Sequence, residues 1–350
     1  MIEDKFFVKK NVLDINKPPL LIAEAGVGHF GSLERAYKLI DLAVESNCKV
    51  IKFQHFLAKD LISETDSTWL ERLSGRDTTI DFIKKIDQYA QRRKICSFFT
   101  PHTEQALDDL IELGLNNLLK IGSGERGNHQ IIKKALDSGA FLLISTGTYL
   151  EEDLNNLKLI LQEYPPNSSC VLHCNTIYPT PPEYVHLSTI LHLKELFKGL
   201  AHIGYSDHTV GTAIPLASVV YGVRVIEKHI SLERNIPNAQ DWKVSCFKED
   251  LSYLVEGIET IWQASNKLIK VKEIPEVEFK NRNWANKSCF LSRDIYKNQV
   301  LTDNDIKIQR PYNGLSPNIV FKKIIGKKYI GENTLKEGSC INESLINLFK

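Results

Sequence analysis

One polar turn holds the densest set of reactive side chains in the sequence. In the segment KIGSGE, Lys120, Ser123 and Glu125 bring together an ammonium, a hydroxyl and a carboxylate, and Gly122 and Gly124 leave backbone amides accessible. The turn follows an apolar run and precedes a helical pattern, which is where α/β proteins place binding groups. These groups suit a phosphate or a carboxylate. A glycine-rich turn also occurs for purely structural reasons, so the interpretation depends on the other strand ends.

Further hydrogen-bond donors end other apolar runs. Lys52 stands inside VIKFQ, Thr100 ends FFT, and Ser145 lies in LLIST. Together with Lys120 and Ser123 they form a set of ammonium and hydroxyl donors that suits an anionic substrate. The alternative is that the lysines are exposed and serve solubility, but the apolar residues on both sides favour a buried role.

Two histidines end neighbouring apolar runs and suggest a metal site. His208 follows IGYSD and His229 ends VIEKH. Imidazoles on adjacent strands can share a divalent ion with open coordination positions, which suits Mn²⁺ or Zn²⁺. The alternative is that each is an ordinary core or surface histidine. Beside a metal-polarised carbonyl, Glu24 and Glu125 are candidates to orient hydroxyl groups or to move a proton.

Strands and helices that alternate along the chain must position these groups. Apolar runs predict strands at 18–26, 49–54, 95–100, 118–121, 141–146, 170–175, 201–205 and 223–229. Helical spacing of apolar residues predicts helices at 32–46, 78–92, 103–113, 130–136, 151–161, 187–196, 209–221 and 249–264. Strict alternation implies parallel strands with helical crossovers. Polar endings after nearly every strand favour a (β/α)8 TIM barrel over an open sheet with one glycine-rich fingerprint.

A second, smaller domain is expected after the barrel. We place the barrel domain at 1–266, a charged linker at 267–280 and a small, mostly β domain at 281–350. Short segments separated by turn signals mark the change from residue 281 onward. A domain of this size has a marginal core, so we expect it to dock on a barrel or on a partner subunit.

Composition excludes several classes of partner. A formal net charge of +1 gives no overall attraction to nucleic acid or to a membrane surface. No apolar run reaches the roughly 18 residues of a membrane-spanning helix, and the N-terminus lacks a signal-peptide pattern. The seven cysteines show no paired CxxC spacing, so we expect reduced thiols in a cytoplasmic protein, with Cys170 and Cys174 as packing residues.

At these residues the chain resembles the N-acetylneuraminate (sialic acid) synthase family. The matching barrel segments are IAEAGVGHFGS (22–32), VIKFQ (50–54), FFTP (98–101), KIGSGE (120–125), LISTGT (143–148), LHCNTIYPTP (172–181), IGYSDHT (203–209) and IEKH (226–229). The segments NRNWANKSCFLSRDI (281–295) and QRPYNGLSP (309–317) resemble the family's C-terminal antifreeze-like (SAF) domain. The resemblance therefore covers nearly the whole chain.

The resemblance implies a reaction and roles for the strand-end residues. Phosphoenolpyruvate would condense with the open-chain aldehyde of an N-acylmannosamine-type sugar and water, releasing phosphate by C–O cleavage and giving a nine-carbon 2-keto acid. The implied phosphoenolpyruvate ligands are Lys52, Thr100, Lys120, Ser123 and Ser145. A divalent metal, usually Mn²⁺ with Mg²⁺ or Co²⁺ as alternatives, would sit on His208 and His229, and Glu24 would position or activate the water.

The resemblance also implies a sugar site that two subunits build. Its barrel residues would be Gln54, Glu125, Tyr178 and Asp241. Arg310, in QRPYNG, matches an arginine that reaches from the C-terminal domain into the barrel of the partner subunit. The implied assembly is a domain-swapped homodimer.

The sequence departs from the family pattern mainly where the sugar would bind. The departing positions are Gly28, Phe30, His102, Thr176, residues 238–240 and Tyr312. Thr176 stands where a typical member has asparagine, and His102 stands where phenylalanine is common. We therefore expect an unusual acceptor, such as a modified or phosphorylated hexosamine. The alternatives are a related phosphoenolpyruvate-dependent synthase acting on a shorter sugar phosphate, and a sugar-binding paralogue that has lost catalysis.

Overall fold

The computed structural model describes residues 9–236, 241–265 and 275–350, in two compact units of residues 1–267 and 268–350. Each unit is described separately below. The predicted departure at residues 238–240 and most of the expected linker at 267–280 lie outside the described residues. Within that linker segment, Glu276–Lys280 form a short helix, α12.

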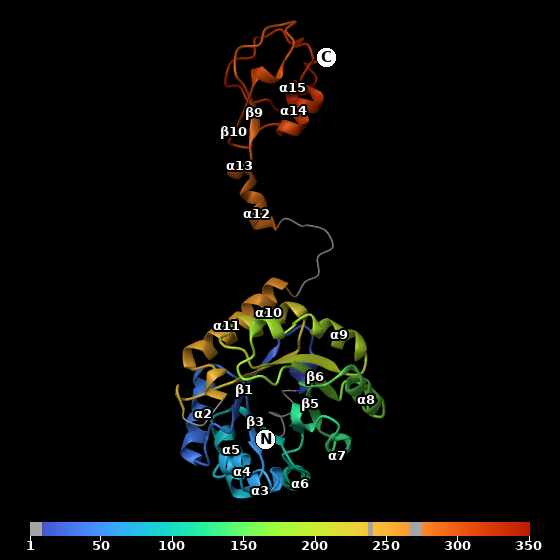
Figure 1. Cartoon of the computed structure of the whole chain (residues 1–350). Coiled ribbons are helices and arrows are strands. Elements are labelled where there is room, and N and C mark those ends of the chain that lie inside the picture. Colours follow the sequence, from blue (N-terminus) through green and yellow to red (C-terminus); the bar gives the residue numbers. More distant parts are fainter. Residues whose placement is uncertain (1–8, 237–240, 266–274) are drawn as a thin grey trace. The chain divides into compact units, whose positions relative to one another are not determined.

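Eight parallel strands of the described residues form a closed barrel in chain order, so the predicted fold is confirmed (Figure 1). The strands are β1 (Leu20–Gly26), β2 (Val50–His55), β3 (Cys96–Pro101), β4 (Leu118–Ile121), β5 (Phe141–Ser145), β6 (Ser169–Cys174), β7 (His202–Asp207) and β8 (Val225–His229). β1 pairs with β2 on one side and with β8 on the other, which closes the ring. All strand ends that carry the predicted site residues therefore meet at one mouth.

Helices on the outside of the barrel connect the strands. They are α2 (Leu33–Glu45), α5 (Ile80–Arg92), α6 (Glu104–Glu112), α7 (His129–Asp137), α8 (Glu151–Gln162), α9 (Thr189–Leu196), α10 (Ala213–Ser218) and α11 (Lys248–Ser265). In α2 the Ser32 hydroxyl caps the helix by accepting from the Arg35 N–H at 3.3 Å. The buried face of α2 is formed by Ala36, Leu39, Ile40 and Ala43, which recur at helical spacing.

Alternate residues of each strand point into the barrel, and this alternation decides which polar groups reach the mouth. The apolar interior contains Leu20, Ile22, Val50, Cys96, Phe98, Leu118, Phe141, Leu143, Cys170, Leu172 and Val225. Continuing the same alternation toward the strand ends gives Glu24, Lys52, Thr100, Lys120, Ser145, Cys174 and Glu227. The site is therefore the polar top layer of an otherwise apolar barrel interior.

The C-terminal unit has its own small core. β9 (Ser288–Leu291) and β10 (Ile306–Gln309) form an antiparallel pair, and isolated bridges such as Phe290 to Cys340 extend it. Short helices accompany them: α13 (Arg282–Ala285), α14 (Pro317–Lys323) and α15 (Glu343–Ile346). The sequence analysis did not predict these helices, because one or two turns show no clear hydrophobic period.

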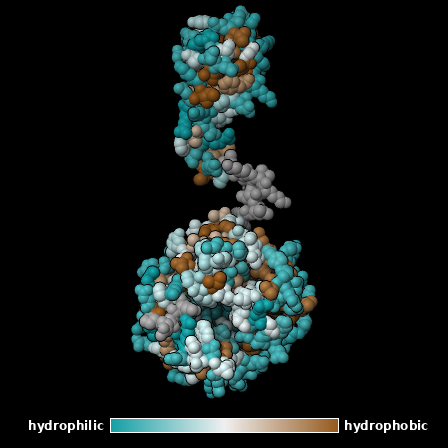
Figure 2. Space-filling view, viewed as in Figure 1, coloured by the Kyte–Doolittle hydropathy of each residue, from teal (hydrophilic) through white to brown (hydrophobic). Residues whose placement is uncertain are grey.

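The face of each unit that Figure 2 shows is mainly hydrophilic, with hydrophobic side chains distributed over it. Isolated exposed hydrophobic residues are normal on soluble domains. Within the described residues, none of the helices has the length and apolar character needed to cross a bilayer.

Candidate active site

A cavity of about 170 Å³ opens at the C-terminal ends of the strands. It is lined by Glu24, Lys52, Gln54, Thr100, His102, Lys120, Gly122, Ser123, Gly124, Ser145, Cys174, Thr176, Tyr178, Ser206, His208, Glu227 and His229. Every strand contributes to this set, either from its last residues or from the loop that follows. The structure thus brings together residues that lie more than two hundred positions apart in the chain.

Two buried lysines and two buried glutamates form the floor of the pocket. Lys52 Nζ lies 2.9 Å from Glu24 Oε2 and donates to Thr100 Oγ1 at 2.9 Å. Lys120 Nζ lies 3.4 Å from Glu227 Oε1, and Lys52 lies 3.8 Å from the other oxygen of Glu227. Both lysines line the pocket, so an anion that binds there would meet their ammonium groups directly.

The pKa shifts of these groups follow from burial and from their neighbours. Burial lowers the pKa of Lys52, but the carboxylates of Glu227 and Glu24 outweigh it, so the pKa rises overall. Burial and the like charge of Lys52 lower the pKa of Lys120, against the opposing pull of Glu227. Burial would raise the pKa of Glu227, but the two ammonium groups and the Ser206 hydroxyl lower it to about 2. Glu227 is therefore a permanent counter-ion to both lysines.

The two predicted metal ligands stand side by side. The ring centroids of His208 and His229 are 5.4 Å apart. His208 Nδ1 bonds the Asn175 carbonyl, which can only accept, so Nδ1 carries the proton and Nε2 keeps its lone pair. Nε2 accepts from the Tyr178 hydroxyl at 2.8 Å. A carbonyl that fixes the tautomer in this way is the usual outer partner of a metal-binding histidine.

The groups around this pair fit a divalent ion with an open coordination shell. Burial lowers the pKa of His229, which favours the neutral imidazole that a metal needs. At His208 burial acts in the same direction, but Cys174 and the Asn175 carbonyl outweigh it and raise the pKa, so a metal must displace a proton there. Among the described residues, no group of three or more His, Cys, Asp and Glu side chains is arranged to hold a metal ion. Two imidazoles would therefore share an ion with substrate and water rather than enclose it. The hydroxyl of Ser145 and one oxygen of Glu227 are also buried without a hydrogen-bond partner in the described structure.

The residues predicted to face the sugar are only partly gathered at the pocket. Gln54 lines it and donates from Nε2 to Glu24 Oε1 at 3.1 Å, and Tyr178 lines it beside His208. Asp241 lies at the edge of the pocket, close to Glu24 and His229. All three side chains surround Gly26: a Cβ added there would lie 3.4 Å from Asp241 Oδ2 and 3.6 Å from both Glu24 Oε1 and His229 Cε1. These side chains surround one small space at the mouth.

Two other predicted sugar residues lie elsewhere. Glu125 is outside the lining set and accepts from Asn128 Nδ2 at 2.7 Å, two residues beyond Ser123. Burial raises the pKa of Glu125. Arg310 belongs to the C-terminal unit, where it donates to the Ala285 carbonyl at 3.0 Å and stacks over the Trp284 ring. Their sugar roles remain predictions.

Sequence reasoning missed several lining residues that the strand alternation could have found. Cys174 was predicted to be a packing residue, like Cys170, but it lines the pocket. Cys170 lies deeper in the same inward register and does pack in the barrel interior. Conversely, His173, the residue before Cys174 in the same strand, points outward and bonds the Val185 carbonyl at 2.6 Å. Glu227, two residues before His229, is also inward and pairs with both lysines.

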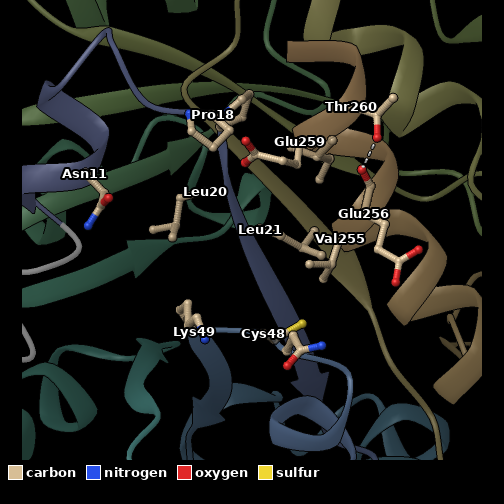
Figure 3. Close-up of a pocket in the computed structure, with 13 residues that line it drawn as sticks. Asn11, Pro18, Leu20, Leu21, Cys48, Lys49, Val255, Glu256, Glu259 and Thr260 are labelled. Carbon is tan, nitrogen blue, oxygen red and sulfur yellow. Dashed lines mark hydrogen bonds between the residues drawn. The ribbon is translucent and has the colours of Figure 1, made fainter. Parts of the chain in front are cut away.

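A larger cavity, of about 690 Å³, lies at the opposite ends of the strands (Figure 3). Leu20 and Leu21 at the start of β1, Lys49 just before β2, and Val255 and Glu256 of α11 line it. The N-terminal ends of barrel strands serve stability, and catalytic groups gather at the C-terminal ends. The smaller, more polar cavity is therefore the candidate active site.

Comparison with known proteins identifies the family. The sequence profile of the NeuB family matches residues 39–270. The chain belongs to the NeuB family. It is 34% identical to N,N'-diacetyllegionaminic acid synthase of Campylobacter jejuni, over 93% of this chain and 100% of that protein. It is 29% identical to N-acetylneuraminate-9-phosphate synthase of Homo sapiens, over 94% of this chain and 93% of that protein.

A solved structure of the family matches as well. The N-acetylneuraminic acid (sialic acid) synthetase of Leptospira borgpetersenii, determined in complex with citrate, matches with a TM-score of 0.69 and 30% identity. The match covers 77% of this chain and 92% of that one. The resemblance to sialic acid synthases is thus confirmed. This NeuB-family chain is an enzyme, a transferase of the phosphoenolpyruvate-dependent synthase class.

Proposed function

We propose that this NeuB-family enzyme condenses phosphoenolpyruvate with an N-acylated mannosamine-type aldose and water, giving a nonulosonic 2-keto acid and phosphate. The observation that carries the proposal is the pair of buried lysines, Lys52 and Lys120, set beside the paired imidazoles of His208 and His229 in one pocket. An anion site next to an open metal position suits a phosphorylated enol that attacks an aldehyde. The names of the relatives, which are legionaminic acid and N-acetylneuraminate-9-phosphate synthases, support the same reaction class.

The phosphoenolpyruvate subsite is assigned to the donors of the pocket floor. Lys52 and Lys120 would supply charge, and Thr100, Ser123 and Ser145 would supply hydroxyl groups. The Ser145 hydroxyl is buried and without a partner, as expected for a group that waits for a ligand. Ser123 accepts from the Gly147 N–H at 2.9 Å and also bonds the Cys174 side chain, and these contacts hold its hydroxyl at the pocket wall.

The reaction balances as one C–C bond formed and one C–O bond broken. C3 of phosphoenolpyruvate bonds to the aldehyde carbon, and the aldehyde oxygen takes up a proton. Water adds to the cationic C2, and the C2–O bond breaks so that phosphate leaves with the bridging oxygen. Glu24, held by Lys52 and by Gln54, is placed to orient this water and accept its proton.

His208 and His229 would hold the divalent metal, most readily Mn²⁺, with Mg²⁺ or Co²⁺ as alternatives. When bound, such an ion polarises the aldehyde oxygen and holds the aldehyde in place. The Asn175 carbonyl accepts from His208 Nδ1 and so keeps that ring oriented. Gln54, Tyr178 and Asp241 would face the sugar from the barrel, together with Glu125 at the edge.

We further propose that the acceptor subsite is completed by Arg310 from the C-terminal domain of a second subunit. The C-terminal unit is then the antifreeze-like domain of a domain-swapped homodimer. The exposed Trp284 side chain, over which Arg310 stacks, fits a surface that is covered in an assembly.

A phosphate-release assay tests the proposed function. Purified enzyme with Mn²⁺ and phosphoenolpyruvate is offered N-acetylmannosamine, further N-acylated and phosphorylated hexosamines, and tetrose and pentose phosphates. We expect release only with N-acylated hexosamines, and unlabelled phosphate when the assay is run in ¹⁸O-water, because the phosphorus–oxygen bond stays intact. The variant K120M is the control for background hydrolysis.

Two results would redirect the assignment. Release only with the shorter sugar phosphates would make the chain a related 2-keto sugar acid synthase with another acceptor. Sugar binding without any release would make it an inactive binding paralogue. The expectation of an unusual acceptor fails if N-acetylmannosamine is turned over as well as every other hexosamine tested.

A further inference from the structure

An imidazole without a hydrogen-bond partner stands in the wall of the active-site pocket. His102 follows β3 in its inward-facing register, two residues beyond Thr100, and lines the pocket. Its Nε2 is buried and has no partner in the described part of the chain. Its backbone is fixed, because its N–H donates to the His55 carbonyl at 3.1 Å. Buried polar atoms are almost always bonded, so an unpaired one in a pocket points to a ligand.

The neighbours place this ring at the anion side of the pocket. A Cβ added to Gly122 would lie 3.7 Å from His102 Cε1, so the ring contacts the turn that also carries Ser123. On its other side the ring meets the Phe56 ring edge-on, with centroids 5.8 Å apart. Lys120, which ends the strand before Gly122, lines the same pocket. His102 is thus held by apolar and backbone contacts that leave its Nε2 without a partner.

The neighbouring residue His55 is an example of a histidine with a structural role in this barrel. His55 Nδ1 lies 2.8 Å from Thr78 Oγ1, and its Nε2 lies 3.1 Å from Asp109 Oδ2. Both of its ring nitrogens are satisfied by protein groups. His102 lies next to it in the fold and has no such partners, so packing alone does not account for an imidazole at this position.

The neutral ring of His102 has one N–H group that can donate a hydrogen bond. Burial, together with the charges of Lys52 and Lys120, lowers the pKa of His102 to about 3, so the imidazole is neutral near pH 7. A neutral imidazole has one donor and one acceptor. Phosphate oxygens only accept, so the N–H is the group that can meet them.

On another wall of the pocket, Thr176 presents its methyl group, at one of the positions where the sequence departs from the family pattern. A Cβ on Gly147 would lie 2.7 Å from Thr176 Cγ2 and 2.7 Å from Ser123 Oγ. The methyl group thus packs beside the hydroxyl that we assign to phosphoenolpyruvate and cannot donate to an anion.

We propose that His102 donates its ring N–H to the phosphate group of phosphoenolpyruvate and supplies the donor that Thr176 does not. This assignment rests on the proposed function, because it takes phosphoenolpyruvate as the substrate. The glycine turn beside the ring and the serine hydroxyls of the same pocket suit an anion, and a phosphate group offers more acceptor oxygens than a carboxylate does.

Calorimetric titration without acceptor sugar tests the proposal. Phosphoenolpyruvate, inorganic phosphate and pyruvate are titrated into wild type, H102F, T176N and H102F/T176N. Phenylalanine keeps the ring against Phe56, and thermal melting checks that the variants are folded. We expect H102F to bind phosphoenolpyruvate and phosphate about tenfold more weakly, the factor that a lost hydrogen bond to a charged group represents. Pyruvate affinity should not change, and H102F/T176N should recover most of the loss.

The outcomes separate this proposal from the proposed function. If wild type binds phosphoenolpyruvate and H102F binds it equally well, His102 is not a phosphate ligand, although the reaction stands. If H102F weakens pyruvate but not phosphate, the assignment to the phosphate group is wrong. If wild type binds neither phosphoenolpyruvate nor phosphate, the proposed function is wrong, and so is the assignment of His102 as a phosphate ligand. H192F, at an exposed histidine of α9, is the matched control and should leave all affinities unchanged.

Discussion

The Lys228 ammonium lies 2.5 Å from the Asp207 carboxylate, and both side chains are completely buried. This ion pair joins β8 to β7 on the outside of the barrel, where Asp207 also accepts from the Tyr205 hydroxyl at 2.7 Å. Each partner directly precedes one of the paired histidines, His208 and His229. This ion pair on the outer side of the strands thus helps to hold the two histidines, which face the barrel interior, at the same level along the barrel axis.

Breaking this pair from one side should destabilise the barrel strongly. We expect K228M to lower the free energy of unfolding by about 3–5 kcal/mol, because Asp207 would remain buried without its counter-ion. The double variant D207N/K228M removes both charges and should lose less. Urea unfolding of the three proteins measures this. Equal stability of K228M and wild type would show that the pair contributes nothing to the fold.

The paired histidines should control metal affinity. We expect H208A and H229A each to weaken Mn²⁺ binding at least about tenfold, because one of two protein ligands is lost. Electron paramagnetic resonance of free Mn²⁺ gives the affinity, and phosphate release gives the activity. H192A is the control at an exposed ring. The metal role would be wrong if H208A kept both metal content and activity.

The barrel interior has no room at Gly204. A Cβ on this residue of β7 would lie 2.2 Å from Leu172 Cδ2 and 2.9 Å from the Val225 carbonyl oxygen. We expect G204A to cost about 1–3 kcal/mol in the free energy of unfolding through overpacking. Shortening Leu172 in G204A/L172A should relieve the contact with that side chain. A melting temperature of G204A equal to that of wild type would contradict the packing seen here.

Stability should fall as the pH is lowered from about 6.5. Burial, with the charges of Arg76 and Arg35, lowers the pKa of His29 to about 4, and the pKa of His102 is lowered to about 3. Above pH 6.5 both rings are neutral in both states. Below pH 6.5 each histidine binds a proton in the unfolded chain but not in the folded protein. Until the pH reaches the folded pKa, each ring therefore lowers the free energy of unfolding by about 1.4 kcal/mol per pH unit.

The contribution of one histidine can be isolated by substitution. Urea unfolding of wild type and H102F at pH 6.5, 5.5 and 4.5 should show a shallower decline for H102F over this interval. H192Q removes a half-exposed ring as a control. Identical slopes for wild type and H102F would mean that His102 is not held neutral in the fold.

Complementation between defective subunits tests the proposed two-subunit site. K52M removes a ligand of the barrel, and R310A removes the arginine of the C-terminal unit. If Arg310 completes the site of a partner, each variant alone is inactive, and mixed dimers regain activity because one site combines an intact barrel with an intact Arg310. Co-expression with two affinity tags isolates the mixed dimers. Inactive mixed dimers would show that Arg310 serves its own barrel.

Much of the fold could be read from the sequence because hydrophobic periodicity is local. The strand predicted at 118–121 and the helix predicted at 151–161 correspond to β4 and α8, whose apolar faces repeat over several residues. The short helices α3 (Ala58–Leu61) and α4 (Ser67–Leu73) were not predicted. α4 buries no residue, so it leaves no hydrophobic pattern to detect.

The sequence by itself determined the barrel and the identity of the groups at its mouth, among them Lys52, Lys120 and His208. Only the tertiary structure decided how they pair: Glu227 lies between both lysines, and the Asn175 carbonyl sets the tautomer of His208. It also decided that His102 Nε2 has no hydrogen-bond partner in the described structure. The reason is that strand alternation is encoded in neighbouring residues, whereas contacts between side chains of different strands exist only once the barrel closes in register.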